Sequence, residues 1–299
     1  MKIKILIAAI FLLGVIAMSF YLKSNSSEMK DKAPISKSKP VQIVILLDLS
    51  DRIIQPGQIE TDKELIIKAF DEFQKQAQSH LLMNSKDRFQ VCIAHQKKLP
   101  FDKDVESEKL TIDLDIIKKA ERVKRLKEFN VSLRSKLDSL YSSAYKGNDT
   151  KNYEGSNLWQ FFNESLPSLL SEKVNTKVIV LTDGYFDFEN RNAVLNKGVL
   201  STTTNFISKL RENINWEAEM KKSGYGILPV DEPLKFVSVC VSEVRSKSEN
   251  NLNETAMLKC IWSNWLNSNG IGDSSYAIVM HSNISNSKSK ISGFLSHSI

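Results

Sequence analysis

Long apolar runs spaced along the chain are its first recognisable feature. Val41–Leu47 is rich in β-branched residues and shows little alternation of polar and apolar positions. Such a run predicts a strand buried on both faces, as at the centre of a parallel sheet. Lys109–Leu114 alternates instead, which predicts a short edge strand. We predict further buried strands over Arg88–His95, Lys177–Leu181, Lys235–Val241 and Tyr276–Met280.

Apolar residues at helical spacing separate these strands. They predict helices from Asp62 to about Met83, from about Ile116 to Tyr145, over Asn157–Leu170 with a break at Pro167, and over about Asn253–Leu266. Strand and helix alternate along most of residues 41–299. We therefore predict an α/β fold: a doubly wound, mostly parallel sheet with helices on both faces.

A long stretch at about 185–233 is predicted to be an insertion into this domain. One hypothesis is a lid or a partner-docking element beside the edge of the sheet where ligands bind. The alternative is an ordinary helix that covers the sheet and ends in a longer loop. The near-helical spacing of Phe206, Leu210 and Ile214 favours the alternative.

The N-terminus carries the strongest membrane signal. Lys2 and Lys4 precede a stretch without charge, 5–22, whose length as a helix is about 27 Å, close to the thickness of a bilayer core. We predict a retained transmembrane anchor within residues 1–23, followed by a flexible linker over 24–40. A signal sequence cleaved near Ala17 is the open alternative. Both interpretations export the main domain to a periplasmic or extracellular location.

Charge and cysteine content narrow the classes of function. The net charge is +6, but residues 1–30 hold four lysines and one glutamate, so half of the excess lies there. The remaining excess is too thinly spread for a surface that follows nucleic-acid phosphates, and we exclude nucleic acid as a partner. Three cysteines are too few for a disulfide framework. We expect three buried thiols, with one bridge left open as an alternative.

Oxygen-bearing side chains follow two of the buried strands. Asp48 and Ser50 come after the first predicted strand, and Thr182 and Asp183 come after the strand that ends at Leu181. Ser156 stands in a loop just before a predicted helix. Ligands of open parallel sheets bind at the carboxyl ends of the strands, where these residues are predicted to gather. Carboxylates and hydroxyls are the hard ligands that Mg²⁺ prefers, so we predict a metal site.

Together these segments resemble a von Willebrand factor type A (VWA) domain. The matching pieces are Asp48-Leu49-Ser50, the Gly155–Leu158 loop and Thr182-Asp183-Gly184, in that order, and the resemblance covers roughly residues 41–297. It implies a metal-ion-dependent adhesion site that holds Mg²⁺, or alternatively Mn²⁺ or Ca²⁺. The implied metal ligands are Asp48, Ser50, Ser156 and Asp183, and a protein partner offers an acidic group to complete the coordination.

One position departs from the family pattern. Arg52 stands where the family has a second serine, and a guanidinium cannot ligate a cation. Its charge would oppose the metal or replace it by pairing with Asp48 or Asp183, while Asp51 would offset that charge. Asp51, Arg52 and Thr182 are therefore expected to modify the site. The second hypothesis is a metal-free VWA-like scaffold or assembly factor in which Arg52 takes the place of the ion.

Ordinary structural roles are the alternative for each of these residues. Asp48 and Asp183 suit turns, and Ser50 and Ser156 suit helix N-caps. Their joint position at one predicted edge favours a site instead. A third hypothesis is a metal-dependent hydrolase that uses the same carboxylates. The chain has no Gly-x-Ser-x-Gly motif and no glycine-rich phosphate loop after the first strand, so we expect a binding protein rather than an enzyme, and no nucleotide.

Overall fold

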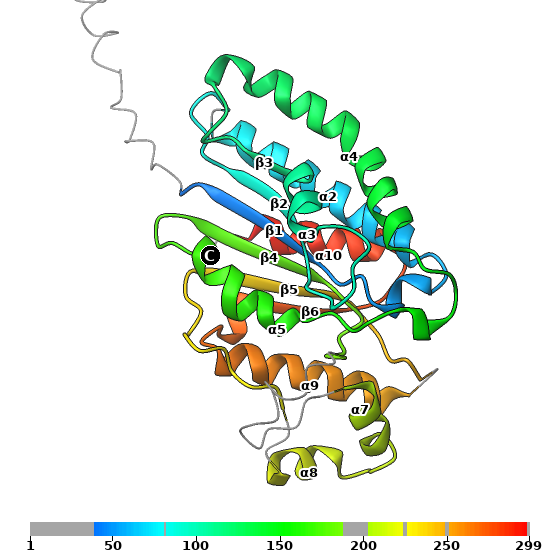
Figure 1. The fold of residues 1–299 in the computed structure, drawn as a ribbon. Coiled ribbons are helices and arrows are strands. Elements are labelled where there is room, and N and C mark those ends of the chain that lie inside the picture. Colours follow the sequence, from blue (N-terminus) through cyan, green and yellow to red (C-terminus); the bar gives the residue numbers. More distant parts are fainter. Residues whose placement is uncertain (1–38, 81, 188–202, 224–225, 249–250, 298–299) are drawn as a thin grey trace, which may run out of the picture. The chain divides into compact units, whose positions relative to one another are not determined.

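In the computed structural model a single sheet forms the centre of the domain (Figure 1). Among the described residues it has six strands in the order β3-β2-β1-β4-β5-β6. Neighbouring strands are parallel except β2 and β3. The strands are β1 (Val41–Leu47), β2 (Arg88–Ile93), β3 (Thr111–Asp113), β4 (Asn175–Leu181), β5 (Val237–Val244) and β6 (Tyr276–Met280). The structure describes residues 39–80, 82–187, 203–223, 226–248 and 251–297.

Helices cover both faces of this sheet, which confirms the predicted fold class (Figure 1). One face packs against α2 (Gln58–Ser79), α4 (Arg122–Ala144) and α10 (Ile284–Ser296). The other face packs against α5 (Leu158–Gln160), its continuation η4 (Phe161–Ser165) and η5 (Leu166–Leu169), and α9 (Leu252–Ser268). Further short helices are η1 (Asp51–Ile54), α3 (Lys103–Lys109), η2 (Lys119–Glu121), η3 (Thr150–Asn152), α7 (Thr204–Leu210), α8 (Trp216–Ser223) and η6 (Asp273–Ser275).

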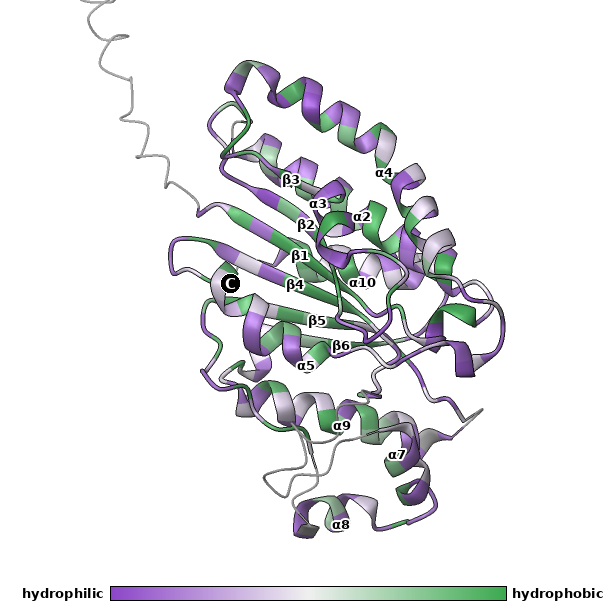
Figure 2. Ribbon diagram, viewed as in Figure 1, coloured by the Kyte–Doolittle hydropathy of each residue, from purple (hydrophilic) through white to green (hydrophobic). Residues whose placement is uncertain are grey.

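Strand β1 contacts a hydrophobic core on each face of the sheet, which explains why its sequence shows little alternation of polar and apolar residues. Ile43, Ile45 and Leu47 point into the core beneath α2 and α4, whereas Val44 and Leu46 point into the core beneath α9. All seven residues of β1 are buried, and all except Gln42 are apolar, so the strand is mostly green in Figure 2. A central strand that feeds two cores needs apolar side chains on both faces.

The order of the strands creates a topological switch point between β1 and β4. The chain leaves β1 for β2 and β3 on one side, then returns to β4 on the other side. Leu47 lies opposite Leu181, and the next residue, Asp48, donates its backbone N–H to the Leu181 carbonyl at 3.1 Å. The loops after β1 and β4 therefore begin side by side, in the place where such sheets bind ligands.

Several local elements differ from the sequence predictions. The helix α10 was not predicted, because its serine-rich sequence has a weak apolar pattern and weak helix propensity. The charged stretch before β3 forms helix α3, capped by Asp102, whose carboxylate accepts from the backbone N–H groups of Asp104 and Val105. The long helix begins at Arg122, later than predicted, after the separate turn η2.

The described part of the predicted insertion belongs to the second core. Ile207 and Leu210 of α7, and Trp216 and Met220 of α8, are buried in the cluster that also contains α9. This packing agrees with a covering element. The segment 188–202 lies outside the described residues, and the lid hypothesis stays a prediction.

The predicted anchor at 1–23 and most of the linker also lie outside the described residues. Within the part that the structure describes, no helix has the length and apolar character needed to cross a membrane.

Candidate functional site

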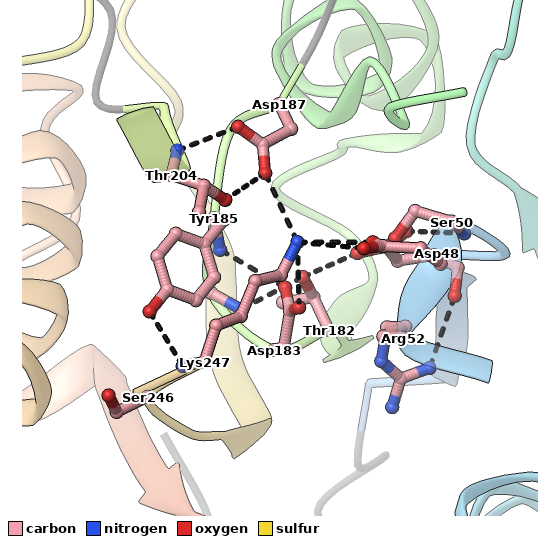
Figure 3. A network of polar contacts seen from close by, with 12 residues as sticks. Asp48, Ser50, Arg52, Thr182, Asp183, Tyr185, Asp187, Thr204, Ser246 and Lys247 are labelled. Atoms are coloured by element: carbon pink, nitrogen blue, oxygen red, sulfur yellow. Dashed lines mark hydrogen bonds and ion pairs between the residues drawn. The ribbon is translucent and has the colours of Figure 1, made fainter. Parts of the chain in front are cut away.

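Asp48 joins the loop after β1 to the loop after β4 (Figure 3). The residue is buried, and one carboxylate oxygen, Oδ1, accepts from the backbone N–H of Ser50 at 3.0 Å. The other oxygen, Oδ2, accepts from the Thr182 hydroxyl at 2.7 Å. Hydrogen bonds to a charged acceptor are stronger than neutral ones, so Asp48 holds both loops in fixed positions. The structure thus brings Asp48, Ser50 and Thr182 together as the sequence predicted.

Asp183 follows Thr182 directly, just after the end of β4. It is 4% exposed, and its Oδ1 accepts from the backbone N–H of Tyr185 at 3.3 Å. Burial raises the pKa of Asp183 to about 7, against the opposing effect of the nearby Lys247 ammonium. Gly184 follows with φ 97°, and a Cβ there would lie 2.9 Å from Val244. The tight Thr182-Asp183-Gly184 turn therefore depends on glycine.

A β-bulge brings a third loop to the same edge. The register between β5 and β6 shifts at Glu243, which has φ 72°, and bulges of this kind re-aim the residues that follow. The backbone N–H of Arg245 then donates to the Asp183 carbonyl at 3.1 Å, and that of Lys247 donates to the Tyr185 hydroxyl at 2.9 Å. The segment after β5 is thereby fastened across the end of β4.

The ammonium group of Lys247 lies among three carboxylates (Figure 3). Its Nζ is 3.1 Å from Asp51, 3.2 Å from Asp187 and 3.7 Å from Asp183. It also lies 5.1 Å from the centre of the Tyr185 ring, a cation–π distance. Burial alone would lower the pKa of Lys247, but the carboxylates raise it above its ordinary value. The positive charge among these three carboxylates is thus supplied by a side chain of the protein rather than by a metal ion.

Arg52 occupies a different place from the one we expected. Its guanidinium forms two hydrogen bonds with the Asp62 carboxylate of α2, at 2.7 and 2.9 Å, and donates to the backbone carbonyl of Asp48 at 3.1 Å. Gln58 and Tyr141 also donate to Asp62, at 2.8 and 2.9 Å. The expectation that Arg52 pairs with the side chain of Asp48 or Asp183 was wrong, because Asp62 offers a buried, planar partner that matches both donors.

Ser156 lies in a neighbouring loop. The backbone N–H of Asn157 donates to the His95 carbonyl at 2.7 Å, so this loop lies against the segment that follows β2. The Ser156 hydroxyl accepts from Gln96 at 3.0 Å. Among the described residues, no hydrogen bond connects Ser156 with Asp48, Ser50 or Asp183. The N-cap of α5 is Asn157, whose side chain accepts from the backbone N–H of Gln160 at 3.0 Å, so the capping role considered for Ser156 was wrong.

Sequence reasoning missed two members of this cluster. Lys247 and Asp62 lie at the carboxyl edge or directly beneath it, and neither belongs to the motif segments. Asp187 was considered from the sequence as a solvated residue with a minor part in an acidic rim, and it pairs with Lys247. The available signal was position: Lys247 follows the predicted strand Lys235–Val241, so the topology places it at the same edge as Asp48. An ammonium group has no lone pair to offer a cation, so a lysine gives no signal in a pattern of metal ligands.

The residues present do not fit a resident Mg²⁺ well. Asp48, Ser50 and Asp183 supply suitable oxygen atoms, but the family's second hydroxyl is replaced by the buried Arg52. A divalent ion beside Asp183 would have to displace the Lys247 ammonium or endure its repulsion. Among the described residues, no cluster of three His, Cys, Asp or Glu side chains has a metal-holding arrangement. These residues instead form an acidic cluster whose counterion is the Lys247 ammonium.

Comparison with known proteins finds distantly similar solved structures and no family. No protein-family model and no curated protein matches the chain. Solved structures that are similar include an aerotolerance-related membrane protein from Bacteroides fragilis NCTC 9343 with multiple mutations to serines, at 14% identity and a TM-score of 0.38, over 85% of this chain and 98% of that chain.

Two further structures are similar at comparable levels. The pilus adhesin SpaC from Lactobacillus rhamnosus GG is 13% identical with a TM-score of 0.40, over 87% of this chain and 30% of that one. Proximal thread matrix protein 1 from the mussel byssus is 10% identical with a TM-score of 0.37, over 86% and 47%. This chain spans less than half the length of these two proteins. The strand order and the acidic edge themselves define a doubly wound α/β domain with a charged cluster at its switch point.

Proposed function

We propose that this chain is an exported, membrane-tethered VWA-like domain that binds a protein partner at the carboxyl edge of its sheet without a resident metal ion. One observation carries the proposal: the Lys247 ammonium lies within 3.1 to 3.7 Å of Asp51, Asp183 and Asp187. Lys247 takes the role that the sequence hypothesis gave to Arg52, and the domain acts as a metal-free scaffold.

The charge balance of this edge indicates the chemistry of the partner. Three carboxylates, those of Asp51, Asp183 and Asp187, lie within 3.7 Å of the Lys247 ammonium, and the Asp48 carboxylate lies beside Thr182 at the same edge. Carboxylates therefore outnumber this ammonium even though burial raises the pKa of Asp183 to about 7. The side chains of Asp51 and Asp187 are 26% and 32% exposed, and a partner can reach them. We therefore propose a partner that offers a basic group. Electrostatic complementarity of this kind sets specificity and the rate of association more than affinity.

The magnesium hypothesis makes the opposite prediction about the partner. With Mg²⁺ held by Asp48, Ser50, Ser156 and Asp183, an acidic group of the partner would complete the coordination. This arrangement requires Lys247 to leave the cluster. The two hypotheses therefore differ in metal dependence, in partner charge and in the effect of removing Lys247.

Thermal unfolding of the full chain in detergent, with EDTA or with Mg²⁺ or Mn²⁺, separates the two hypotheses. We expect no metal-dependent shift in the parent protein. Lys247→Gln frees the carboxylates, so this variant is expected to gain a shift, which Asp183→Asn added to it should abolish. A bound ligand at about 100 times its dissociation constant stabilises a protein by roughly 2.7 kcal/mol, which moves the midpoint measurably.

Lys173→Gln, at an exposed lysine away from the cluster, is the matched control and should behave as the parent. A shift already present in the parent, abolished by Asp183→Asn and not enlarged by Lys247→Gln, would overturn the metal-free proposal. That outcome would direct the search toward acidic partners.

A further inference from the structure

The opposite edge of the sheet carries an exposed corner built from two segments. The segments 82–87 and 114–124 lie together there, because the Leu114 N–H donates to the Asp87 carbonyl at 3.0 Å. The buried guanidinium of Arg122 donates to the carbonyls of Leu82 and Ser85, at 3.0 and 2.8 Å. We call these two segments the amino-edge corner. Their backbone positions are fixed by a buried arginine, so the corner is a formed surface.

Large apolar side chains of the amino-edge corner are exposed to solvent. Ile116 is 82% exposed, Val123 is 61% exposed and Met83 is 45% exposed. Isolated exposed apolar residues are common, but three on two adjoining segments, with Val123 in the first turn of α4, indicate a binding surface. Helix α4 carries its own core-facing residues separately, among them Leu126 and Phe129. The exposed residues therefore take no part in the packing of the domain.

Lysines surround these apolar side chains. Four exposed lysines lie within the corner, against two exposed acidic residues, Asp115 and Glu121, because the third, Asp87, is buried. Lys86 forms an ion pair with Asp115 at 3.1 Å, and Lys119 donates to Asn84 at 3.1 Å. The corner thus combines an excess of positive charge with aliphatic side chains, the combination found at membrane interfaces. The four lysines are Lys86, Lys118, Lys119 and Lys124.

The chain enters the domain beside the same segments. The backbone N–H of Val41, the first residue of β1, donates to the Asp87 carboxylate at 2.6 Å. The predicted linker over 24–40 spans at most roughly 60 Å, at about 3.5 Å per residue. If the apolar stretch 5–22 is an anchor, the amino-edge corner stays within that distance of the bilayer. A short tether gives even a weak surface contact a high effective concentration.

We propose that the amino-edge corner docks on an anionic lipid surface. Ile116, Val123 and Met83 enter the interfacial layer, and the lysines contact the negatively charged headgroups. In this arrangement the carboxyl edge, at the other ends of the parallel strands, faces away from the lipid and is open to a partner. The proposal uses the predicted anchor and is independent of the function proposed for Lys247.

Hydrogen–deuterium exchange of the full chain in lipid nanodiscs tests this docking. One set of discs contains phosphatidylcholine alone, and the other contains about one third phosphatidylglycerol, whose negative charge attracts lysines. We expect slower exchange of 82–87 and 114–124 on the anionic discs only. We also expect the protection to disappear at about 0.5 M salt, where surface charges are screened.

A matched pair of variants makes the test specific. The triple variant Ile116→Ser, Lys118→Glu, Lys119→Glu should lose the protection. The control variant Ile214→Ser, Lys221→Glu, Lys222→Glu changes an isoleucine that is 88% exposed and two exposed lysines near α8, and it should keep the protection. Exchange within β1 and β4 reports whether each variant is folded, and Met83→Ser alone is a milder second variant.

Two outcomes would overturn the proposal. Equal exchange of the corner on both kinds of disc would exclude recognition of anionic lipid. Protection that appears without anionic lipid and grows with protein concentration would assign the corner to contact with a second copy of the chain.

Discussion

Two lysines, one near each edge of the same sheet, have their ammonium groups held by different partners. At the carboxyl edge, Lys247 lies among three carboxylates, which raise its pKa above the ordinary value. Toward the amino edge, Lys177 of β4 donates to the carbonyls of Leu295 and His297 at the end of α10, at 2.6 and 2.7 Å. Burial lowers the pKa of Lys177 to about 8.

This difference shows what each arrangement can do. Carbonyl dipoles at the end of a helix partly compensate a buried ammonium, but they carry no full charge. Lys177 therefore serves the packing of α10 against the sheet. Carboxylates that outnumber their ammonium leave a negative surface after pairing, so the Lys247 cluster can contact another molecule. A lysine at the edge of a sheet thus says little about function until its partners are known.

The largest effect is expected where a charge is buried most completely. Asp62→Ala removes the carboxylate partner of Arg52, which is 2% exposed, and leaves its guanidinium without a counterion. Breaking such a pair costs about 3–5 kcal/mol of unfolding free energy. Urea unfolding measures the loss. The double variant Arg52→Met, Asp62→Leu should recover much of it, and an equal loss in both variants would show that volume rather than charge matters here.

A pH-dependent effect should follow from Lys177. Its pKa is about 8 in the folded protein and 10.5 ordinarily, so the unfolded chain binds more protons between these values. Stability from this residue is therefore reduced below pH 8 and rises as the pH increases from 8 to about 10.5, by about 3 kcal/mol at most. The difference in urea midpoint between the parent and Lys177→Met across this range isolates the contribution. A difference that does not change with pH would contradict it.

Neutralising the two lysines at pH 7 compares the two edges directly. Lys247→Met leaves the carboxylates without their counterion and should cost about 1–2 kcal/mol, discounted because Lys247 is partly exposed. Lys177→Met removes both an unfavourably buried charge and its hydrogen bonds, so the net change should stay within about 1 kcal/mol. Urea unfolding of the two variants side by side measures both. A larger loss for Lys177 would reverse the comparison.

The smallest change in stability is expected at the amino-edge corner. Lys118→Glu and Lys119→Glu alter exposed side chains away from any buried pair, so each should change the unfolding free energy by no more than about 0.5 kcal/mol. The same substitutions should weaken docking on anionic lipid. Parallel unfolding and nanodisc measurements check both statements. A large loss of stability would mean that these lysines belong to the fold and not to a docking surface.

Much of the fold could be predicted from local pattern. The seven buried residues of β1 are apolar except for Gln42, and Asp48 follows directly after them. Asp183 comes just after β4 in the same way. Parallel strands bring their carboxyl ends to one edge, so the proximity of Asp48, Ser50, Thr182 and Asp183 followed from sequence. Helix α10 was not predicted because its serine-rich sequence depends on packing against the sheet and α2 for its stability.

The choice of counterion was beyond local pattern. Arg52 lies four residues from Asp48, whereas Lys247 lies 196 residues from Asp51, yet Lys247 is the one among the carboxylates. Arg52 pairs with Asp62 because the first turns of α2 place a buried carboxylate within reach of both terminal nitrogens of the guanidinium. Lys247 lies among the carboxylates because a bulge at the end of β5 directs the following segment across the end of β4. Apolar periodicity is encoded within a few neighbouring residues, but the pairing of charges depends on distances that exist only after the strands and helices have packed.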